Sequence, residues 1–367
     1  MMRRIWLAAL LAAALPALSI AVEYPGAVFL MIFPDARTTA LGGCGVALND
    51  LDANAYYNPA SIVAGPRAAA TWTHMNNQIG HDPGMTYDDV GVACRHRERL
   101  GLAVNVAYSQ SGTDKIWNWH GDVVGSYRPF DIAPSVSAAY RILPCLSAGV
   151  TAKAIYSFLY PDLVRKYYPF PEPLPTGHAF TVGFDGGVQY RVWSPLTLGA
   201  SIENVGPRLR FDSTKSDRLP TLVRLGFALK PRIPGPVEVA LVGDVWRDLV
   251  SPIDWWLGGD STVMLWENLQ RGLGLEVRIA RMATLRLGYF EDIVDQQGGI
   301  IVPDPYGYPR HISLLRYLLE HHGKPTDIGL CWGVGLEYRG LKFDVGVDES
   351  VYDYATRNVR LQLSARL

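Results

Sequence analysis

The feature that most constrains this chain is a regular alternation of short and long links between runs of alternating apolar and polar residues. About fourteen such runs lie between Arg67 and Leu367, each near the roughly ten residues that a membrane-spanning strand needs. Every second link is a tight turn: Arg95–Glu98, Ile142–Pro144, Val192–Pro195, Arg232–Pro236, Ala280–Met282 and Arg339–Gly340. The links between them are long: Gln110–Arg128, Asp162–Thr176, Asn204–Leu219, Trp246–Gln270 and Glu291–Pro325. This pattern predicts an all-β fold, a transmembrane up-and-down antiparallel β-barrel of about 14 strands, with turns at one rim and loops at the other.

The alternation can be followed residue by residue in several runs. In Leu100–Ser109, the odd-numbered and even-numbered residues separate into a small or polar set and an apolar set. Leu341–Asp348 and Val359–Leu367 behave in the same way. Because successive side chains of a strand point to opposite faces, one set is expected to face lipid and the other the lumen.

The predicted lumen face carries charges of both signs in nearly equal number. They are Lys153, Asp185, Glu203, Arg224, Glu238, Asp244, Glu276, Arg278, Arg286, Glu337, Arg339 and Lys342. A wide pore tolerates such charges, and so does a lumen filled by protein, in which they must pair. The many glycines and alanines on the same face favour the filled or narrow version. A soluble sandwich or a lipocalin-like barrel also alternates, but it mixes loop lengths at both ends.

The first residues are typical of a secretory signal peptide. Arg3 and Arg4 precede the apolar stretch Leu7–Ala17, and Ser19-Ile20-Ala21 supplies small residues for cleavage. We expect residues 1–21 to be removed on export to the outer membrane of a Gram-negative-type envelope; the alternative is an uncleaved anchor helix. The four cysteines show no metal-ligand spacing and allow three pairings among which the sequence does not choose. A formal net charge of −1 without a basic stripe argues against a nucleic-acid partner.

Residues 22–66 precede the first strand of the expected barrel (67–367) and do not alternate. Gly42 and Gly43 suit close backbone approach, and Pro59 keeps Asn58 out of the helical region. The small residues of this segment predict that it folds into the lumen. The alternative is a disordered tail, although the segment has few charges for one.

The same segment carries a family resemblance. The run "ARTTALGG…GVALNDLDANAYYNPASI" resembles the N-terminal signature of the PorV/PorQ branch of FadL-like (FadL/TodX) outer-membrane barrels. A second stretch, 198–229, resembles the family's "N-x-G-P … LP … LRLG" block, and "VGDVWRDL", 242–249, is a weaker third match. Cys44 within the glycine run and the non-aromatic last residue, Leu367, depart from the family pattern.

The resemblance implies an N-terminal hatch in the lumen, with Gly42, Gly43, Asn58, Pro59 and Ala60 in the hatch motif. It also implies one of two functions. A PorV/PorQ-type barrel receives or shuttles secreted cargo proteins in type IX secretion, with secretion machinery as a partner, and this is the first hypothesis. The alternative is FadL-like transport of hydrophobic small molecules across the outer membrane. A third possibility is a structural barrel with neither role.

No catalytic arrangement is present in the sequence. It has no Gly-x-Ser-x-Gly elbow and no His-Glu-x-x-His helix. Adjacent His321 and His322 point in different directions on a helix, so they favour solvated residues over a metal site. The sequence therefore predicts a protein that is not an enzyme and holds no metal or cofactor.

The long loops are rich in aromatic residues. Trp117, Trp119, Trp255 and Trp256 are candidate contacts for an outer-loop ligand or partner. The alternative is an aromatic girdle at the lipid interface, which we favour for rings beside strand ends such as Trp246. His311–His322 has the spacing of an amphipathic helix, suited to a lid over the barrel, a partner contact or simple packing.

Overall fold

The computed structural model of the chain describes most of its length. The described residues are 25–50, 55–79, 86–167, 174–212, 215–250, 269–293, 297–304, 306–320, 323–349 and 357–366. The predicted signal peptide and two of the candidate loop residues, Trp255 and Trp256, lie outside them. No helix in the described part of the chain is both long and apolar enough to cross a membrane.

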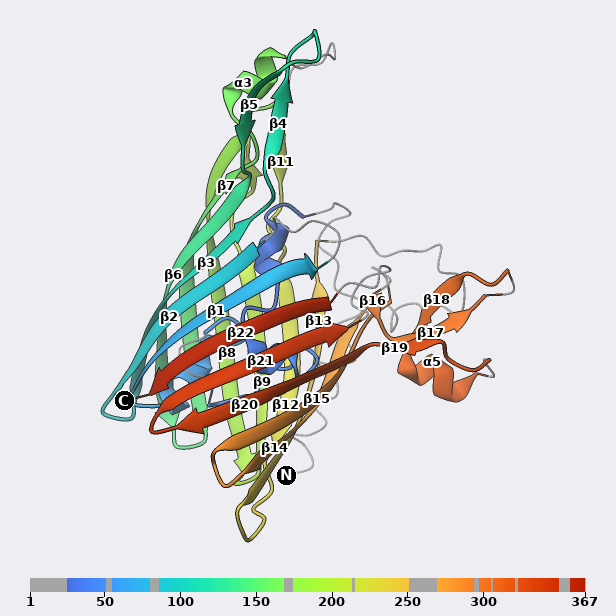
Figure 1. Cartoon of the computed structure of the whole chain (residues 1–367). Helices are drawn as coiled ribbons and strands as arrows, with labels where there is room; N and C mark the ends of the chain where they lie inside the picture. Colours follow the sequence, from blue (N-terminus) through green and yellow to red (C-terminus); the bar gives the residue numbers. More distant parts are fainter. Residues whose placement is uncertain are drawn as a thin grey trace.

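Fourteen antiparallel strands of the described chain form one closed wall (Figure 1). They are β1 (Ala68–Ile79), β2 (Thr86–His96), β3 (Leu100–Gln110), β6 (Phe130–Leu143), β7 (Leu146–Phe158), β8 (His178–Trp193), β9 (Leu196–Val205), β12 (Leu222–Leu229), β13 (Val237–Asp248), β14 (Gln270–Ile279), β15 (Ala283–Asp292), β20 (Leu330–Tyr338), β21 (Leu341–Glu349) and β22 (Arg357–Arg366). Each pairs with the next, and β22 pairs with β1 from Ala69 opposite Arg366 to Ile79 opposite Arg357. The predicted barrel of about 14 strands is therefore confirmed. Closure leaves no edge of this sheet unpaired.

The outer face of the wall is apolar, as the alternation predicts. Leu102 and Val104 are 44% and 53% exposed, whereas Ala103 between them is 2% exposed. Phe343 and Leu363 on β21 and β22 are likewise exposed. A soluble sandwich would bury these side chains in its core, so their exposure contradicts that alternative.

Tight turns close one rim of the barrel, which we call the turn rim. The turns after β2, β14 and β20 contain pairs of residues with positive φ, such as Arg339 (φ 51) and Gly340 (φ 82). Positive φ at both central residues is the geometry of a type I′ turn, whose twist matches that of antiparallel strands. This turn geometry accounts for three of the short links seen in the sequence.

The opposite rim carries the loops and their small elements. β4 (Asp114–Trp117) and β5 (Val123–Tyr127) form a hairpin, and with α3 (Asp162–Lys166) they stand on the tall side of the barrel, above β6, β7 and β8 (Figure 1). Shorter pieces occupy the other loops: β10 (Leu209–Arg210), β11 (Ser216–Asp217), β16 (Gln297–Gly298), β17 (Ile300–Pro303), β18 (Pro309–Ile312), α5 (Leu314–Leu319) and β19 (Asp327–Ile328). The sequence predicted strands of near-uniform length, but β8 has 16 residues and β12 has 8.

The chain before β1 runs inside the barrel. It contains η2 (Val28–Met31), α2 (Ala36–Thr39) and η3 (Pro59–Ala64), and we call residues 25–50 and 55–66 the N-terminal segment. Its η2 lies at the loop end, where the backbone N–H of Gly26 donates to the carbonyl of Arg218. Its η3 packs on β6, β7 and β8 near the turn rim, just before β1 begins. The segment therefore crosses the lumen from the loops to the turns.

Candidate functional site

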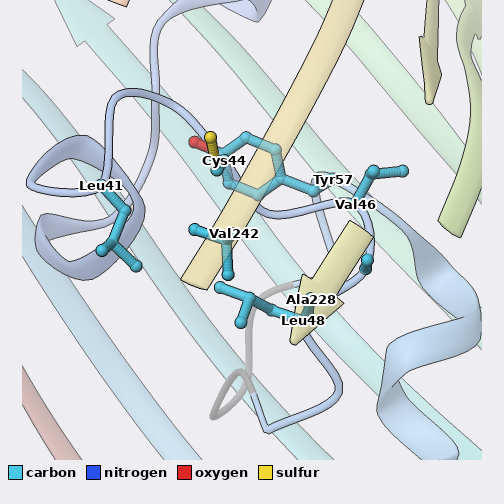
Figure 2. Close-up of a cluster of buried hydrophobic side chains, with 8 residues drawn as sticks. Leu41, Cys44, Val46, Leu48, Tyr57, Ala228 and Val242 are labelled. Carbon is cyan, nitrogen blue, oxygen red and sulfur yellow. The ribbon is translucent and has the colours of Figure 1, made fainter. Parts of the chain in front are cut away.

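A hydrophobic cluster joins the N-terminal segment to the wall. Leu41, Cys44, Val46, Leu48 and Tyr57 of the segment pack against Ala228 of β12 and Val242 of β13, all essentially inaccessible to solvent (Figure 2). Tyr57 also lies under the Arg224 guanidinium, 5.0 Å from the ring centre. The segment thus has a buried face of its own, as a folded part of the protein does.

Helix α2 is capped by Asp35 of the same segment and is bonded to the wall by the side chain of Gln362. The Asp35 carboxylate accepts from the backbone N–H of Thr38 at 2.8 Å, and the Gln362 side chain accepts from the N–H of Ala36 at 3.0 Å. Burial raises the pKa of the Asp35 carboxyl above its ordinary value, and hydrogen bonds from Thr38 oppose that rise. These contacts satisfy N–H groups that a helix start leaves without partners.

A chain of buried ion pairs runs from the segment into the wall. The Arg37 guanidinium donates to both oxygens of Glu276 at 2.8 Å, and Glu276 also accepts from Arg286 at 2.8 Å. Arg286 continues to Asp344 at 2.7 Å, and Asp344 pairs with Lys342 at 2.7 Å. Glu276, Arg286 and Lys342 belong to the wall charges that were predicted to face the lumen and to pair if protein filled it, and the contacts show such pairing. Glu238 and Arg339 of the same predicted set lie instead at the turn rim and are exposed.

Asn58 holds the segment against β8 and β9. Its side-chain amide donates to the carbonyls of Val46, Val188 and Ala200 at 2.9, 3.0 and 3.3 Å. Its side-chain oxygen accepts from the N–H of Ala60 at 3.0 Å and so caps η3. Asn58 is fully buried, so these bonds are made without competition from water.

Gly187 leaves room for Asn58. A Cβ atom at Gly187 would lie 2.1 Å from the Asn58 side-chain oxygen. Neighbouring Gly186 faces outward, where a Cβ would meet only Ile202, at 3.8 Å. We expect Gly187→Val to lower the free energy of unfolding by about 1–3 kcal/mol, the usual cost of overpacking, and Gly186→Val to leave it nearly unchanged. Urea titration of the two variants in the same detergent checks this, and equal effects would contradict it.

Above the segment, at the loop end, lies an open cavity of about 460 Å³ that we call the vestibule. Phe29, Met31 and Phe33 of the segment form part of its lining. The wall contributes aromatic, polar and charged side chains: Met75, Ser109, Asp131, Leu222, Arg224, Trp246, Gln270, Phe290, Asp292, Asp348, Asn358 and Arg360. The vestibule therefore combines apolar and aromatic side chains, which we call its floor, with polar and charged ones.

Three rings form the aromatic part of this floor. Phe33 packs edge-on against Trp246 and Phe290, with ring centres 6.0 and 5.8 Å apart, and Trp246 stacks on Phe290 at 5.8 Å. Arg224 lies over Trp246 at 4.4 Å. The prediction that Trp246 belongs to a lipid-facing girdle is wrong, since this ring is 3% exposed and faces the lumen. Trp246 is two residues from Asp244, which was predicted to face the lumen. Because side chains two apart in a strand share a face, this spacing indicates that Trp246 faces the lumen too.

The space below the vestibule is much smaller. A cavity of about 40 Å³ is lined by Leu30 and Tyr56 of the segment and by wall residues such as Tyr87 and Lys153. Phe29 lines the vestibule while adjacent Leu30 lines this cavity, so η2 contributes to the boundary of both. For comparison, an apolar cavity of about 150 Å³ binds benzene. The vestibule exceeds that size and the inner cavity falls short of it.

The predicted site residues are divided between two places. Gly42, Gly43, Asn58, Pro59 and Ala60 all lie in the N-terminal segment within the barrel and are buried. Trp117 and Trp119 lie at the end of the β4–β5 hairpin and are 54% and 61% exposed. The sequence missed Phe33 and Phe290, because nothing in their local pattern indicates that they meet.

The described part of the amphipathic stretch at 311–322, residues 311–320, does not lie over the lumen, and His321 and His322 lie outside the described residues. Its helix α5 projects beside the barrel at the loop end (Figure 1), where Glu291 of β15 accepts from the N–H of Leu314 at 2.8 Å. Leu315 and Leu318 and outward-facing wall residues line an external groove of about 600 Å³. A lid over the mouth is therefore not the arrangement in this structure. Among the described residues no group of side chains suits a metal ion.

The comparisons with known proteins agree with the architecture. No protein-family model matches the sequence, and no curated protein matches it. The structure is similar to that of TbuX, a toluene transporter of Ralstonia pickettii, with TM-score 0.53 and 13% identity over 90% of this chain and 98% of that one. It is also similar to TodX, a toluene transporter of Pseudomonas putida, with TM-score 0.51 and 12% identity over 89% and 95% of the two chains. At such identities the likeness establishes the fold alone, a 14-strand barrel of the kind that the resemblance implies. The PorV/PorQ assignment stays a prediction.

Proposed function

We propose that this chain is an outer-membrane channel that admits hydrophobic small molecules, with the N-terminal segment as its hatch. The observation that carries the proposal is the vestibule, whose floor is built jointly from hatch side chains (Phe29, Met31, Phe33) and wall rings (Trp246, Phe290). Apolar and aromatic side chains in a pocket with a few polar groups are typical of small-molecule sites. The apolar outer wall supports placement in a membrane.

The hatch accounts for selectivity in this proposal. Ion pairs and hydrogen bonds hold it across the lumen, and the inner cavity is too small for an aromatic ring. A molecule bound in the vestibule touches Phe29 and Phe33, so it contacts the hatch directly. Passage then requires a rearrangement of the hatch that binding in the vestibule can favour.

The two similar solved structures, both toluene transporters, favour this function over the first hypothesis from the sequence. Cargo reception in type IX secretion stays a prediction from the PorV/PorQ resemblance, and no comparison supports it. The exposed Trp117 and Trp119 are the residues that such a partner would meet.

Uptake of radiolabelled toluene by cells that express the chain tests the proposal. We expect uptake above that of cells carrying an empty vector, in a host with an intact lipopolysaccharide layer. Uptake at the vector level would overturn the channel proposal. Pull-down from solubilised membranes tests the other reading, because recovery of secreted proteins that share a sorting domain would support cargo reception.

The ring of Phe33 should contribute to ligand binding. Phe33→Leu keeps an apolar side chain in the vestibule but removes its ring, and a ring contact with a bound aromatic molecule is worth about 0.5–1.5 kcal/mol. We therefore expect toluene uptake at low concentration to fall about threefold to tenfold, with surface expression unchanged. Phe343→Leu, on the outer wall and 42% exposed, is the matched control. Equal uptake by the two variants would argue against binding at the vestibule floor.

A further inference from the structure

The turn rim is strongly basic. It comprises the tight turns and the strand residues beside them, residues 67, 95–99, 141–146, 191–196, 230–238, 278–282, 337–341 and 366. Twelve basic residues lie here against three carboxylates, in a chain with 34 basic and 35 acidic residues. The basic ones are Arg67, Arg95, Arg97, Arg99, Arg141, Arg191, Lys230, Arg232, Arg278, Arg281, Arg339 and Arg366, and the carboxylates are Glu98, Glu238 and Glu337. The rim thus holds a large positive excess in a chain that is nearly neutral overall.

Carboxylates neutralise only some of these charges. Asp50 of the N-terminal segment pairs with Lys230 at 2.8 Å. Glu238 pairs with Arg281 at 3.2 Å and with Arg278 at 3.6 Å, and Glu337 pairs with Arg366 at 3.2 Å. The exposed side chains of three other rim arginines make no ion pair with any described residue: Arg67, Arg99 and Arg191.

Several of these arginines lie on neighbouring turns. The backbone N–H of Arg95 donates to the carbonyl of Arg67, and that of Arg141 donates to the carbonyl of Arg99, both at 2.9 Å. Like charges held together without counter-charges repel one another and favour an anionic ligand.

Exposed apolar side chains lie at the same level as the arginines. Ile142, Leu143, Ile233 and Met282, all in the turns or beside them, are 46–54% exposed. In water, exposure of these apolar side chains would be unfavourable in free energy. A rim set in the headgroup region lets them enter lipid while the arginines extend to the charged surface. This combination favours a lipid surface over a soluble acidic polymer.

We propose that the turn rim binds the phosphate headgroups of anionic phospholipids in the leaflet around it. The inference rests on the membrane placement in the proposed function, but not on transport. A guanidinium donates two parallel hydrogen bonds to a phosphate, so arginine suits this ligand better than lysine does. The barrel then carries a ring of selected lipids at the end opposite the vestibule.

Lipid enrichment tests the proposal. The purified full chain is equilibrated in mixed micelles with equal amounts of phosphatidylglycerol and phosphatidylcholine, and the co-purifying lipids are quantified. We expect phosphatidylglycerol to be enriched over the micelle ratio, and the enrichment to disappear at high salt. Arg67→Gln/Arg99→Gln/Arg191→Gln should reduce the affinity for phosphatidylglycerol at least about tenfold, since each basic residue near an anionic surface contributes about fivefold.

The matched control neutralises three exposed arginines at the loop end: Arg128→Gln/Arg210→Gln/Arg310→Gln. It should retain the enrichment, and a variant with lysine at positions 67, 99 and 191 should retain part of it. Heat-modifiable mobility on gels shows that each variant is folded. Toluene uptake by the rim variant should persist, so failure of the lipid-binding proposal can be told apart from failure of the channel proposal. Equal enrichment in the rim and loop variants would overturn the inference, as would no enrichment in the unmodified chain. Binding of soluble polyglutamate in place of lipid would overturn it in favour of an acidic soluble partner.

Discussion

Replacing Glu276 by glutamine should lower the free energy of unfolding by about 3–5 kcal/mol, the cost of breaking a buried ion pair from one side. The Glu276 carboxylate accepts from both Arg37 and Arg286, whose side chains are 3% and 0% exposed. A neutral amide removes one of two counter-charges from each guanidinium, because Arg37 keeps Asp50 at 3.1 Å and Arg286 keeps Asp344 at 2.7 Å, and water does not replace the lost charge at this buried position. Urea unfolding in detergent or liposomes, followed by tryptophan fluorescence or gel mobility, measures the loss.

The same substitution at the turn rim provides the control. Glu238 pairs with Arg281 and Arg278, but its side chain is 49% exposed, and exposed pairs contribute about 0–1 kcal/mol. Glu238→Gln should therefore have little effect, and a loss as large as that of Glu276→Gln would contradict the argument from burial. A double-mutant cycle with Arg37→Met separates the bond to the hatch from the bond within the wall.

The alternation of side chains accounts for most of what the sequence predicted correctly. An alternation with a period of two over ten residues indicates which side chains of a strand face outward. It placed Leu102 and Val104 on the outside and Asp185 and Glu276 in the lumen, as the structure has them. The link lengths then supplied the barrel topology and the two different rims. Both signals come from residues close together in the sequence, and such short-range patterns can be read from one sequence.

The errors come from contacts between residues far apart in sequence. Asn58 meets Val188 and Ala200 more than 100 residues later, and no nearby pattern indicates which wall strands it touches. The position of α5 beside the barrel depends on where its whole loop packs. The prediction for Trp246 was wrong because it relied on the position of this residue near a strand end. The alternation that places Trp246 on the same face as Asp244 is the better guide.

Asn58→Leu should release the hatch from β8 and β9 and destabilise it by about 3–5 kcal/mol. The leucine cannot donate to the carbonyls of Val46, Val188 and Ala200, of which Val46 keeps a bond from the Gln189 amide. The substitution also removes the cap on η3. Each buried polar group left without a partner costs about 1–3 kcal/mol. A loosened hatch predicts two readouts, faster trypsin cleavage at Arg37 and more frequent openings of the channel in planar bilayers.

Ser61→Ala separates loss of these bonds from general damage to η3. Ser61 is also buried, three residues further along, but its hydroxyl has no hydrogen-bond partner among the described residues. Its removal should therefore leave cleavage and conductance close to those of the unmodified chain. If Asn58→Leu behaved like Ser61→Ala, the hatch would be held by its apolar cluster and the Arg37 ion pairs alone. If both variants opened the channel, η3 would matter through its packing and not through the Asn58 amide. Only a large effect of Asn58→Leu with a small effect of Ser61→Ala agrees with an amide that ties the hatch to the wall.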